Sequence, residues 1–277
     1  MESTTEYANA SRVSDAEGFV RETPERTLSL TVSYNGAPFS GFARQPGQLT
    51  VQGELEQALS LVFRRPMEVV CSGRTDAGVH ALGQVVSFDV ANDELEGRNL
   101  YSLRRSLNAL THEDITVREV EERQPGFSAR FDAQWREYHY HVCLDEVPPL
   151  FMRDFSWYVH GQLDIDAMRE AAAHLVGEHD FKSFCMAASA VGKPTCRNVH
   201  EISLSREMIM GEGILTIKVV GNAFLHSMVR TIVGTLVMVG RGQRKPEWVR
   251  EVLEARNRTA AGENAPAAGL VFWRVQY

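Results

Sequence analysis

The stretch that decides the fold reads SGRTDAGVHALGQVVSF and spans residues 72–88. Its second half runs into an alternation of apolar and polar residues that predicts a strand over residues 85–90. Residues 67–72, directly before the glycine-containing loop, predict another strand. Asp76 therefore falls on a loop held between two rigid elements, a place where catalytic groups often lie.

Two glycines bracket this loop in a spacing that resembles a phosphate-binding loop. That motif continues with lysine and then serine or threonine directly after the second glycine. Here Val79 and His80 follow Gly78, so the lysine that would reach the phosphates is missing. We therefore exclude a phosphate-binding loop.

The composition is that of an ordinary globular protein, with 277 residues, 44% hydrophobic and 23% charged. This length allows one large domain or two smaller ones. The net charge of -7 does not point to a nucleic-acid partner, although phosphate binding depends on local and not total charge. Four scattered cysteines without a Cys-x-x-Cys pair argue against a disulfide framework or a zinc site and favour a reducing compartment.

The N-terminal residues 1–25 are acidic and polar, and we predict a flexible tail there. They lack the basic start and the apolar stretch of a signal peptide. No apolar run reaches the roughly 18 residues that a membrane span needs. We therefore expect a cytoplasmic protein without a membrane partner.

Strand and helix patterns alternate along both parts of the chain. This fits an α+β fold of two similar halves, which we place at residues 26–123 and 124–277. Strands are predicted at 27–34, 67–72, 85–90, 136–144, 199–205, 213–220 and 270–277, and helices at 51–65, 98–109, 164–177, 222–240 and 246–255.

The predicted helix 222–240 is apolar around most of its circumference and should be buried. Asn222, His226 and Arg230 fall four residues apart on one stripe of it. A buried arginine without an anion is costly, so Arg230 needs a carboxylate or a phosphate. A structural ion pair and a functional site are equally good interpretations at this point, and His226 by itself is best interpreted as a packing residue.

Several segments together resemble one family, the TruA-type tRNA pseudouridine synthases. The resemblance covers the chain from about residue 27 to its end, with the segments in the family's order and spacing. It is carried by FSGFARQ at 39–45, SGRTDAGVHALGQV at 72–85, FSARFDA and REYHY within 127–140, NAFLHSMVRTIVG at 222–234 and AGL at 268–270.

This resemblance implies an isomerase that converts uridine to pseudouridine around positions 38 to 40 of the tRNA anticodon stem-loop. It implies a pseudouridine synthase fold, in which two related halves form a mostly antiparallel mixed sheet flanked by helices with a central cleft. It also implies a homodimer and no metal or other cofactor. The family's essential aspartate matches Asp76. An ionised carboxylate there would attack the sugar or remove the C2′ proton, and a neighbouring Arg74 would favour the ionised form.

The resemblance also assigns substrate-binding residues. Tyr138 matches an active-site tyrosine whose ring would stack on the extruded uracil. Arg230 matches an arginine in the cleft, and Leu270 matches an apolar residue that contacts the uracil. Arg44 and Arg130 lie in matched segments and are our main candidates for contacts with RNA phosphates. Weaker candidates are Arg136, Lys193, Arg197, Arg241, Arg244 and Lys245.

The chain departs from the family pattern at Phe42, Ala43, Ser128 and Trp135, which puts the choice of tRNA positions in doubt but not the reaction. Two other function classes stay open. One is an RNA-binding protein that keeps the cleft but not the chemistry. The other is an aspartate-dependent hydrolase, for which His80 is the nearest candidate base, although no residue in the sequence is placed to orient it.

Overall fold

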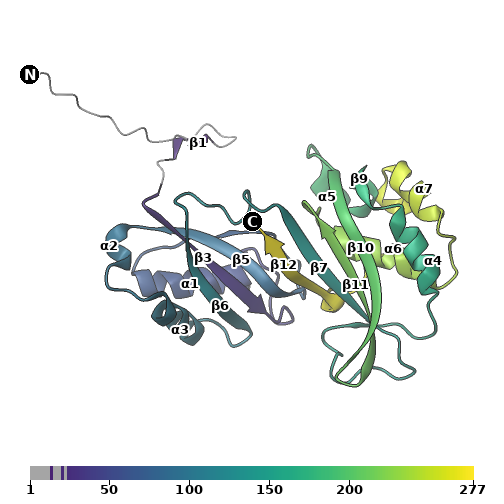
Figure 1. Ribbon diagram of the computed structural model, residues 1–277, viewed down its shortest axis with the longest axis horizontal. Helices are drawn as coiled ribbons and strands as arrows, with labels where there is room; N and C mark the ends of the chain where they lie inside the picture. Colours follow the sequence, from purple (N-terminus) through teal and green to yellow (C-terminus); the bar gives the residue numbers. More distant parts are fainter. Residues whose placement is uncertain (1–12, 15–19, 22–23) are drawn as a thin grey trace, which may run out of the picture.

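The computed structural model describes residues 13–14, 20–21 and 24–277, and most of the predicted tail, residues 1–25, lies outside these ranges. A ten-stranded sheet runs through the molecule in the order β6-β3-β5-β12-β7-β11-β10-β9, with β4 paired to β5 and β8 to β7 (Figure 1). Its pairs are antiparallel except β12 with β5 and β7 with β8. This confirms the predicted α+β fold with a mostly antiparallel sheet.

The elements of the N-terminal part begin with a two-stranded ladder and then build one side of the large sheet. They are β1 (Val13–Ser14), β2 (Val20–Arg21), β3 (Arg26–Tyr34), α1 (Val51–Phe63), β4 (Val70–Cys71), β5 (His80–Val90), α2 (Asn92–Leu95), α3 (Leu100–Leu110) and β6 (Ile115–Arg123).

The remaining elements build the other side. They are β7 (Trp135–Cys143), β8 (Trp157–Tyr158), α4 (Ile165–Ala173), β9 (Gly177–Asp180), η1 (Phe181–Phe184), α5 (Ala187–Ala190), β10 (Cys196–Ile209), β11 (Glu212–Gly221), α6 (Met228–Gly240), α7 (Trp248–Ala255), η2 (Arg258–Ala260), η3 (Ala267–Gly269) and β12 (Leu270–Gln276).

The last strand, β12, joins the two sides of the sheet. It pairs in parallel with β5 and antiparallel with β7, so the sheet continues from one side to the other (Figure 1). Strands β3, β5 and β6 all come from residues 26–123, the predicted N-terminal half. The division at residue 123 and the central cleft stay predictions, because the sheet and its core are continuous across them.

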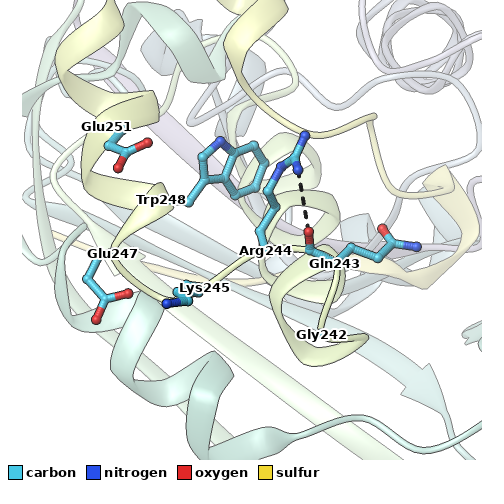
Figure 2. A pocket seen from close by; sticks show the side chains of 7 residues that line it. All are labelled: Gly242, Gln243, Arg244, Lys245, Glu247, Trp248 and Glu251. Carbon is cyan, nitrogen blue, oxygen red and sulfur yellow. Dashed lines mark hydrogen bonds between the residues drawn. The ribbon is translucent and has the colours of Figure 1, made fainter.

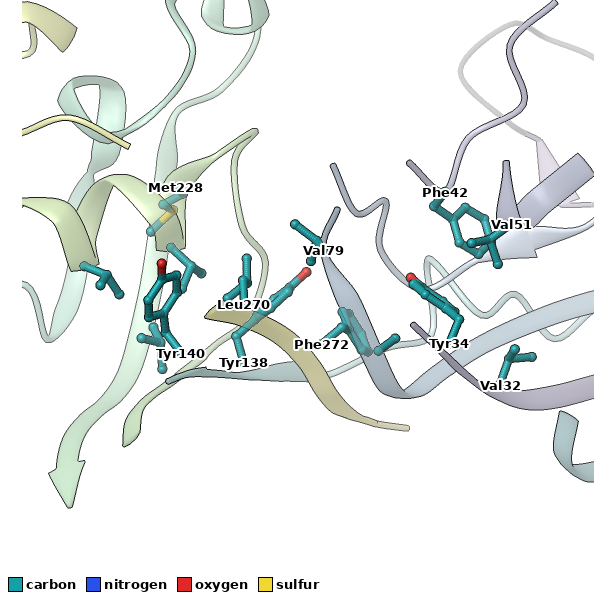
Figure 3. Close-up of a cluster of buried hydrophobic side chains, with 14 of the residues drawn as sticks. Val32, Tyr34, Phe42, Val51, Val79, Tyr138, Tyr140, Met228, Leu270 and Phe272 are labelled. Carbon is teal, nitrogen blue, oxygen red and sulfur yellow. The ribbon is translucent and has the colours of Figure 1, made fainter. Parts of the chain in front are cut away.

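One buried apolar cluster also spans both sides. Figure 3 shows it running from Phe42 and Tyr34 past Phe272 and Tyr138 to Tyr140. Helices α1 and α3 contact each other and α3 packs against β6, whereas α4 packs against α6 and β10. No helix among the described residues is long and apolar enough to cross a membrane.

Several predicted boundaries were wrong. The helix predicted at 222–240 begins only at Met228, because β11 continues to Gly221 and Asn222 turns the chain with its own side chain. Strand β5 begins at His80 and not at residue 85. Strands β6 and β9 were not predicted, since charged residues hide the apolar alternation of β6 and β9 is short and polar.

Candidate active site

The loop between β4 and β5 is fixed by contacts with the segment after β3. The Phe42 N–H donates to the Thr75 carbonyl at 3.0 Å, and the Thr75 and Tyr34 hydroxyls lie 2.8 Å apart. A side chain on Gly41, at φ +99°, would meet the same carbonyl at 3.1 Å. The backbone next to Asp76 is therefore held closely by its neighbours.

Glycine is required at the start of the loop for a packing reason. A Cβ on Gly73 would lie 3.2 Å from the Phe272 ring and 3.5 Å from the Tyr138 hydroxyl oxygen. The Gln84 side chain donates to the Gly73 carbonyl at 2.6 Å and accepts from the Ser72 hydroxyl at 2.7 Å. The loop thus lies against aromatic side chains of β7 and β12.

The Asp76 carboxylate is held by three side chains from the other side of the molecule. Its Oδ2 accepts from the Ser227 hydroxyl at 3.0 Å and from Arg230 Nη1 at 3.1 Å. Its Oδ1 lies 3.2 Å from His226 Nε2. The carboxylate stays 26% exposed, so a ligand can reach it.

Arg230 is anchored as well as paired. Its Nε donates to the Ala265 carbonyl at 2.8 Å, and the Ala265 N–H donates back to the Arg230 carbonyl at 3.0 Å. The side chain is only 18% exposed. The prediction that this arginine needs an anion is confirmed, and the anion is the carboxylate of Asp76.

His226 and Ser227 were missed as site residues. His226 was interpreted as a packing residue, but its ring lies between Asp76 and the Ser189 hydroxyl, 2.9 Å from its Nδ1. The sequence signal was its position four residues before Arg230. Ser227 directly precedes α6 in the left-handed region, at φ 60°, and its hydroxyl contacts Asp76 instead of capping the helix.

Arg74 does not pair with Asp76, contrary to our expectation. Its side chain is exposed, and within residues 24–277 it forms no ion pair with the carboxylate. The intervening Thr75 turns inward to Tyr34, and the fold brings Arg230 to Asp76 from a distant part of the chain. Sequence proximity therefore identified the wrong cation.

Tyr138 and Leu270 lie close to each other in the buried apolar cluster (Figure 3). The Tyr138 ring is 7% exposed and meets Phe224 and Phe272 edge-on, at 5.0 Å between centroids. Burial raises the pKa of its phenol, and the neighbouring Tyr34 and Asp76 act in the same direction, so the hydroxyl stays protonated. Tyr140, by contrast, is a core residue whose hydroxyl donates to the Pro266 carbonyl.

Two predicted RNA contacts have internal partners. Arg136 is buried and donates to the carbonyls of Ser72, Arg130, Ala133 and Asn222, so its prediction as an RNA contact was wrong. Arg44 lies 3.2 Å from the buried Glu56 carboxylate while its own side chain stays 62% exposed. Its internal role is to compensate this buried charge.

Among the other predicted basic contacts, Arg197 is half-buried and donates to the Pro194 and Cys196 carbonyls, whereas the rest lie on the surface. Arg130 is exposed and lies over the Phe131 ring. Arg244 and Lys245 line a depression of about 580 Å³ between α6 and α7, where Arg244 packs over the Trp248 ring (Figure 2). The same depression contains Glu247 and Glu251, so its charge is mixed.

His80, the candidate base of a hydrolase, is a structural residue. Its Nδ1 accepts from the Gly36 N–H at 3.0 Å, and its ring packs against Phe155. Burial lowers the pKa of its imidazole. It makes no contact with Asp76 among the described residues, so it does not complete a catalytic pair with it.

The arrangement supplies one accessible carboxylate in a fixed position, with Arg230 and Ser227 hydrogen-bonded to it and the His226 ring 3.2 Å away. An ionised carboxylate is the form that attacks a carbon or removes a proton. The described part of the chain has no group of three or more His, Cys, Asp or Glu side chains that could hold a metal ion. The reactive group that this arrangement offers is the partly exposed carboxylate of Asp76.

Comparisons with known proteins identify relatives over most of the chain. A family model described as tRNA pseudouridine synthase matches residues 30–132 and 171–277. The tRNA pseudouridine synthase A of Brevibacillus brevis is 46% identical over 252 residues, which cover 91% of this chain and all of the relative. The protein of the same name from Bacillus subtilis is 42% identical and covers 90% of this chain and 98% of its own length.

A solved structure also overlaps the chain, but loosely. It is an H/ACA RNP bound to a substrate RNA containing 2′-deoxyuridine, with 12% identity and a TM-score of 0.35 over 77% of this chain and 43% of that chain.

Proposed function

The chain belongs to the tRNA pseudouridine synthase family of isomerases, and we propose that it converts uridine to pseudouridine at positions 38 to 40 of the tRNA anticodon stem-loop, with Asp76 as its essential carboxylate. One observation carries the proposal for Asp76. A loop of the N-terminal half presents this carboxylate, and Ser227 and Arg230 of the C-terminal half bind it.

The reaction explains why such a carboxylate is needed. The bond between uracil N1 and C1′ breaks, the uracil turns over, C5 bonds to C1′, and the C5 proton is released. An ionised Asp76 acts at the sugar, either by attacking C1′ or by removing the C2′ proton so that a glycal forms. Both routes require a carboxylate held in a fixed position at the sugar, and the Arg230 guanidinium 3.1 Å away supports that position.

The neighbouring side chains then receive roles in substrate binding. In this proposal the uracil binds against the side chains of Tyr138 and Leu270. Contact with this aromatic and aliphatic surface offsets part of the free energy needed to extrude the base from the stem. The exposed side chains of Arg74, Arg44 and Arg130 contact parts of the RNA other than this uracil. Arg230 holds the Asp76 carboxylate in position.

Tritium release tests the reaction and the aspartate together. A tRNA transcript labelled with tritium at C5 of uridine loses the label when C5 bonds to C1′. We expect wild type to release tritium and Asp76→Asn to release none, because the amide keeps the shape but lacks the charge. Asp166→Asn is the matched control, since Asp166 is 91% exposed and its one ion pair among the described residues is with Arg169.

Three outcomes separate the alternatives. Full activity of Asp76→Asn removes the proposed role of Asp76. Binding of tRNA by wild type without any release supports the RNA-binding alternative. Release that persists when cytidine replaces uridine at positions 38 to 40 moves the modified site elsewhere in the tRNA.

The family resemblance further suggests a homodimer in the cytoplasm. Neither property rests on a contact within this chain. Light scattering coupled to size-exclusion chromatography tests the first, and a mass of one 31.0 kDa chain at micromolar concentration would contradict it.

A further inference from the structure

Three arginines form a cluster away from the candidate active site, at the edge of the sheet. Arg104 and Arg105 of α3 and Arg118 of β6, here called the arginine patch, line a depression of about 590 Å³. Its other lining residues are Asn108, Ala109, Thr116 and Val117, so no acidic residue belongs to it. This is notable in a chain with a net charge of -7, because acidic residues outnumber basic ones overall.

The patch is a preformed surface. The Asn108 side-chain amide donates to the Val117 carbonyl at 2.8 Å and accepts from the Val117 N–H at 2.9 Å, which joins α3 to β6. Arg104 donates to the Arg118 carbonyl at 3.0 Å and lies over the exposed Tyr101 ring. A ligand therefore meets cations whose backbone positions are already fixed, which lowers the entropic cost of binding.

The arginines have no carboxylate to neutralise them. None of the three forms an ion pair with any residue in the described ranges, and Arg105 forms no side-chain hydrogen bond there either. Guanidinium groups suit phosphate oxygens because their planar donors bind two oxygens at once. The depression between α6 and α7 is less suited, since Glu247 and Glu251 lie beside its cations.

The patch is connected to the loop that carries Asp76. Arg118 Nε donates to the Ser33 hydroxyl, and the next residue, Tyr34, bonds through its own hydroxyl to Thr75. Thr75 directly precedes Asp76. Two consecutive residues of β3 therefore connect the patch to the loop that carries Asp76.

We propose that the arginine patch binds the sugar-phosphate backbone of the tRNA substrate, at nucleotides outside the uridine pocket. The inference rests on the proposed function for the identity of the RNA. A polyanion that delivers a uridine to Asp76 extends well beyond the pocket, and an acid-free cationic surface on an otherwise acidic protein attracts its phosphates. The patch contributes affinity and orientation and takes no part in the chemistry.

Arg105→Glu is the sharpest test, because Arg105 has no side-chain hydrogen bond or ion pair to lose within the described residues. Affinity for an unmodified tRNA transcript is measured by fluorescence anisotropy at several salt concentrations. We expect Kd to rise about tenfold, and the slope of log affinity against log salt to shrink by about one. The rate of tritium release at saturating tRNA should equal that of wild type, because the reacting groups are unchanged.

Arg206→Glu is the matched control, since Arg206 is an exposed arginine of β10 that also lacks a side-chain partner among the described residues. It carries the same charge change and should bind tRNA nearly as wild type does. Arg118→Gln is a second patch variant and should weaken binding in the same direction as Arg105→Glu.

Two results would overturn the inference. One is wild-type affinity and salt dependence in both patch variants, and the other is an equal loss in Arg206→Glu, which would make the effect one of net charge. Because binding is measured separately from tritium release, failure of the proposed function is distinguishable. A protein that binds tRNA through the patch without forming pseudouridine refutes the function alone.

Discussion

Ser227 combines a backbone constraint and a polar contact in one residue. Its φ of 60° lies in the left-handed region, which costs a non-glycine residue about 1 kcal/mol or more. Its hydroxyl donates to Asp76 at 3.0 Å. The strained conformation is therefore kept at a position where it places a donor on the carboxylate.

Two substitutions separate these contributions. Ser227→Ala and Ser227→Gly both remove the hydroxyl and should lower kcat by about tenfold, the value of one hydrogen bond to a charged group. Only glycine relieves the backbone strain, so Ser227→Gly should be more stable than Ser227→Ala by about 1 kcal/mol. Steady-state kinetics measures kcat and thermal unfolding measures stability for the two variants. Unequal kcat values would show that the backbone conformation of residue 227, and not only its hydroxyl, determines the rate.

The segment between β7 and β8 is ordered by one carboxylate on the neighbouring strand. Glu212, the first residue of β11, accepts from the backbone N–H groups of Leu150, Phe151 and Met152 at 2.5, 2.9 and 2.8 Å. Burial alone would raise the pKa of Glu212, but these three donors outweigh it and the pKa is lowered from 4.5. The contact requires the charged form, so it should depend on pH.

We expect Glu212→Gln to be less stable than wild type at pH 7, because an amide brings its own N–H groups against these donors. A carboxyl with a lowered folded-state pKa contributes its full stability above its unfolded pKa and loses it as pH falls through the folded value. The difference in melting temperature between the two proteins should therefore shrink below about pH 4.5, near the unfolded value. A difference that is constant between pH 7 and pH 3 would contradict this account.

The whole molecule depends on its C-terminal strand. Phe272 of β12 is fully buried, contacts the Tyr138 ring edge-on at 5.0 Å, and would lie 3.2 Å from a Cβ on Gly73. It therefore touches both β7 and the loop that carries Asp76. Phe272, in the strand that joins the two sides of the sheet, therefore also supports the candidate active site.

Phe272→Ala should lower the free energy of unfolding by about 3–5 kcal/mol, the usual cost of removing a buried phenyl ring. It should also lower kcat, because the loop loses its support near Gly73. Val275→Ala, a change at a half-buried residue of the same strand, is the control and should affect both quantities much less. Chemical denaturation measures the free energy of unfolding of both variants, and tritium release measures their kcat. A wild-type kcat in a destabilised Phe272→Ala protein would show that β12 does not support the candidate active site.

Much of the local structure could be predicted from near-neighbour patterns. The caps of Thr50 and Asp164 start helices where expected, with side-chain oxygens accepting from Gly53 and Ala167. The hairpin of β10 and β11 follows from alternation, although both strands are longer than predicted. Strand β6 was not predicted because charged residues interrupt its apolar alternation. It is a half-exposed edge strand that buries only a few of its side chains.

The sequence by itself determined that Asp76 lies on a short loop at a strand end, and that Arg230 needs an anion. Only the tertiary structure decided that these two requirements meet, because Asp76 and Arg230 are 154 positions apart and no periodic pattern connects them. The same holds for β12, whose alternation predicts a strand but not its place between β5 and β7. Local spacing fixes which elements form, whereas contacts between distant segments fix the partners of each charge, which is why Arg230 and not Arg74 holds the carboxylate.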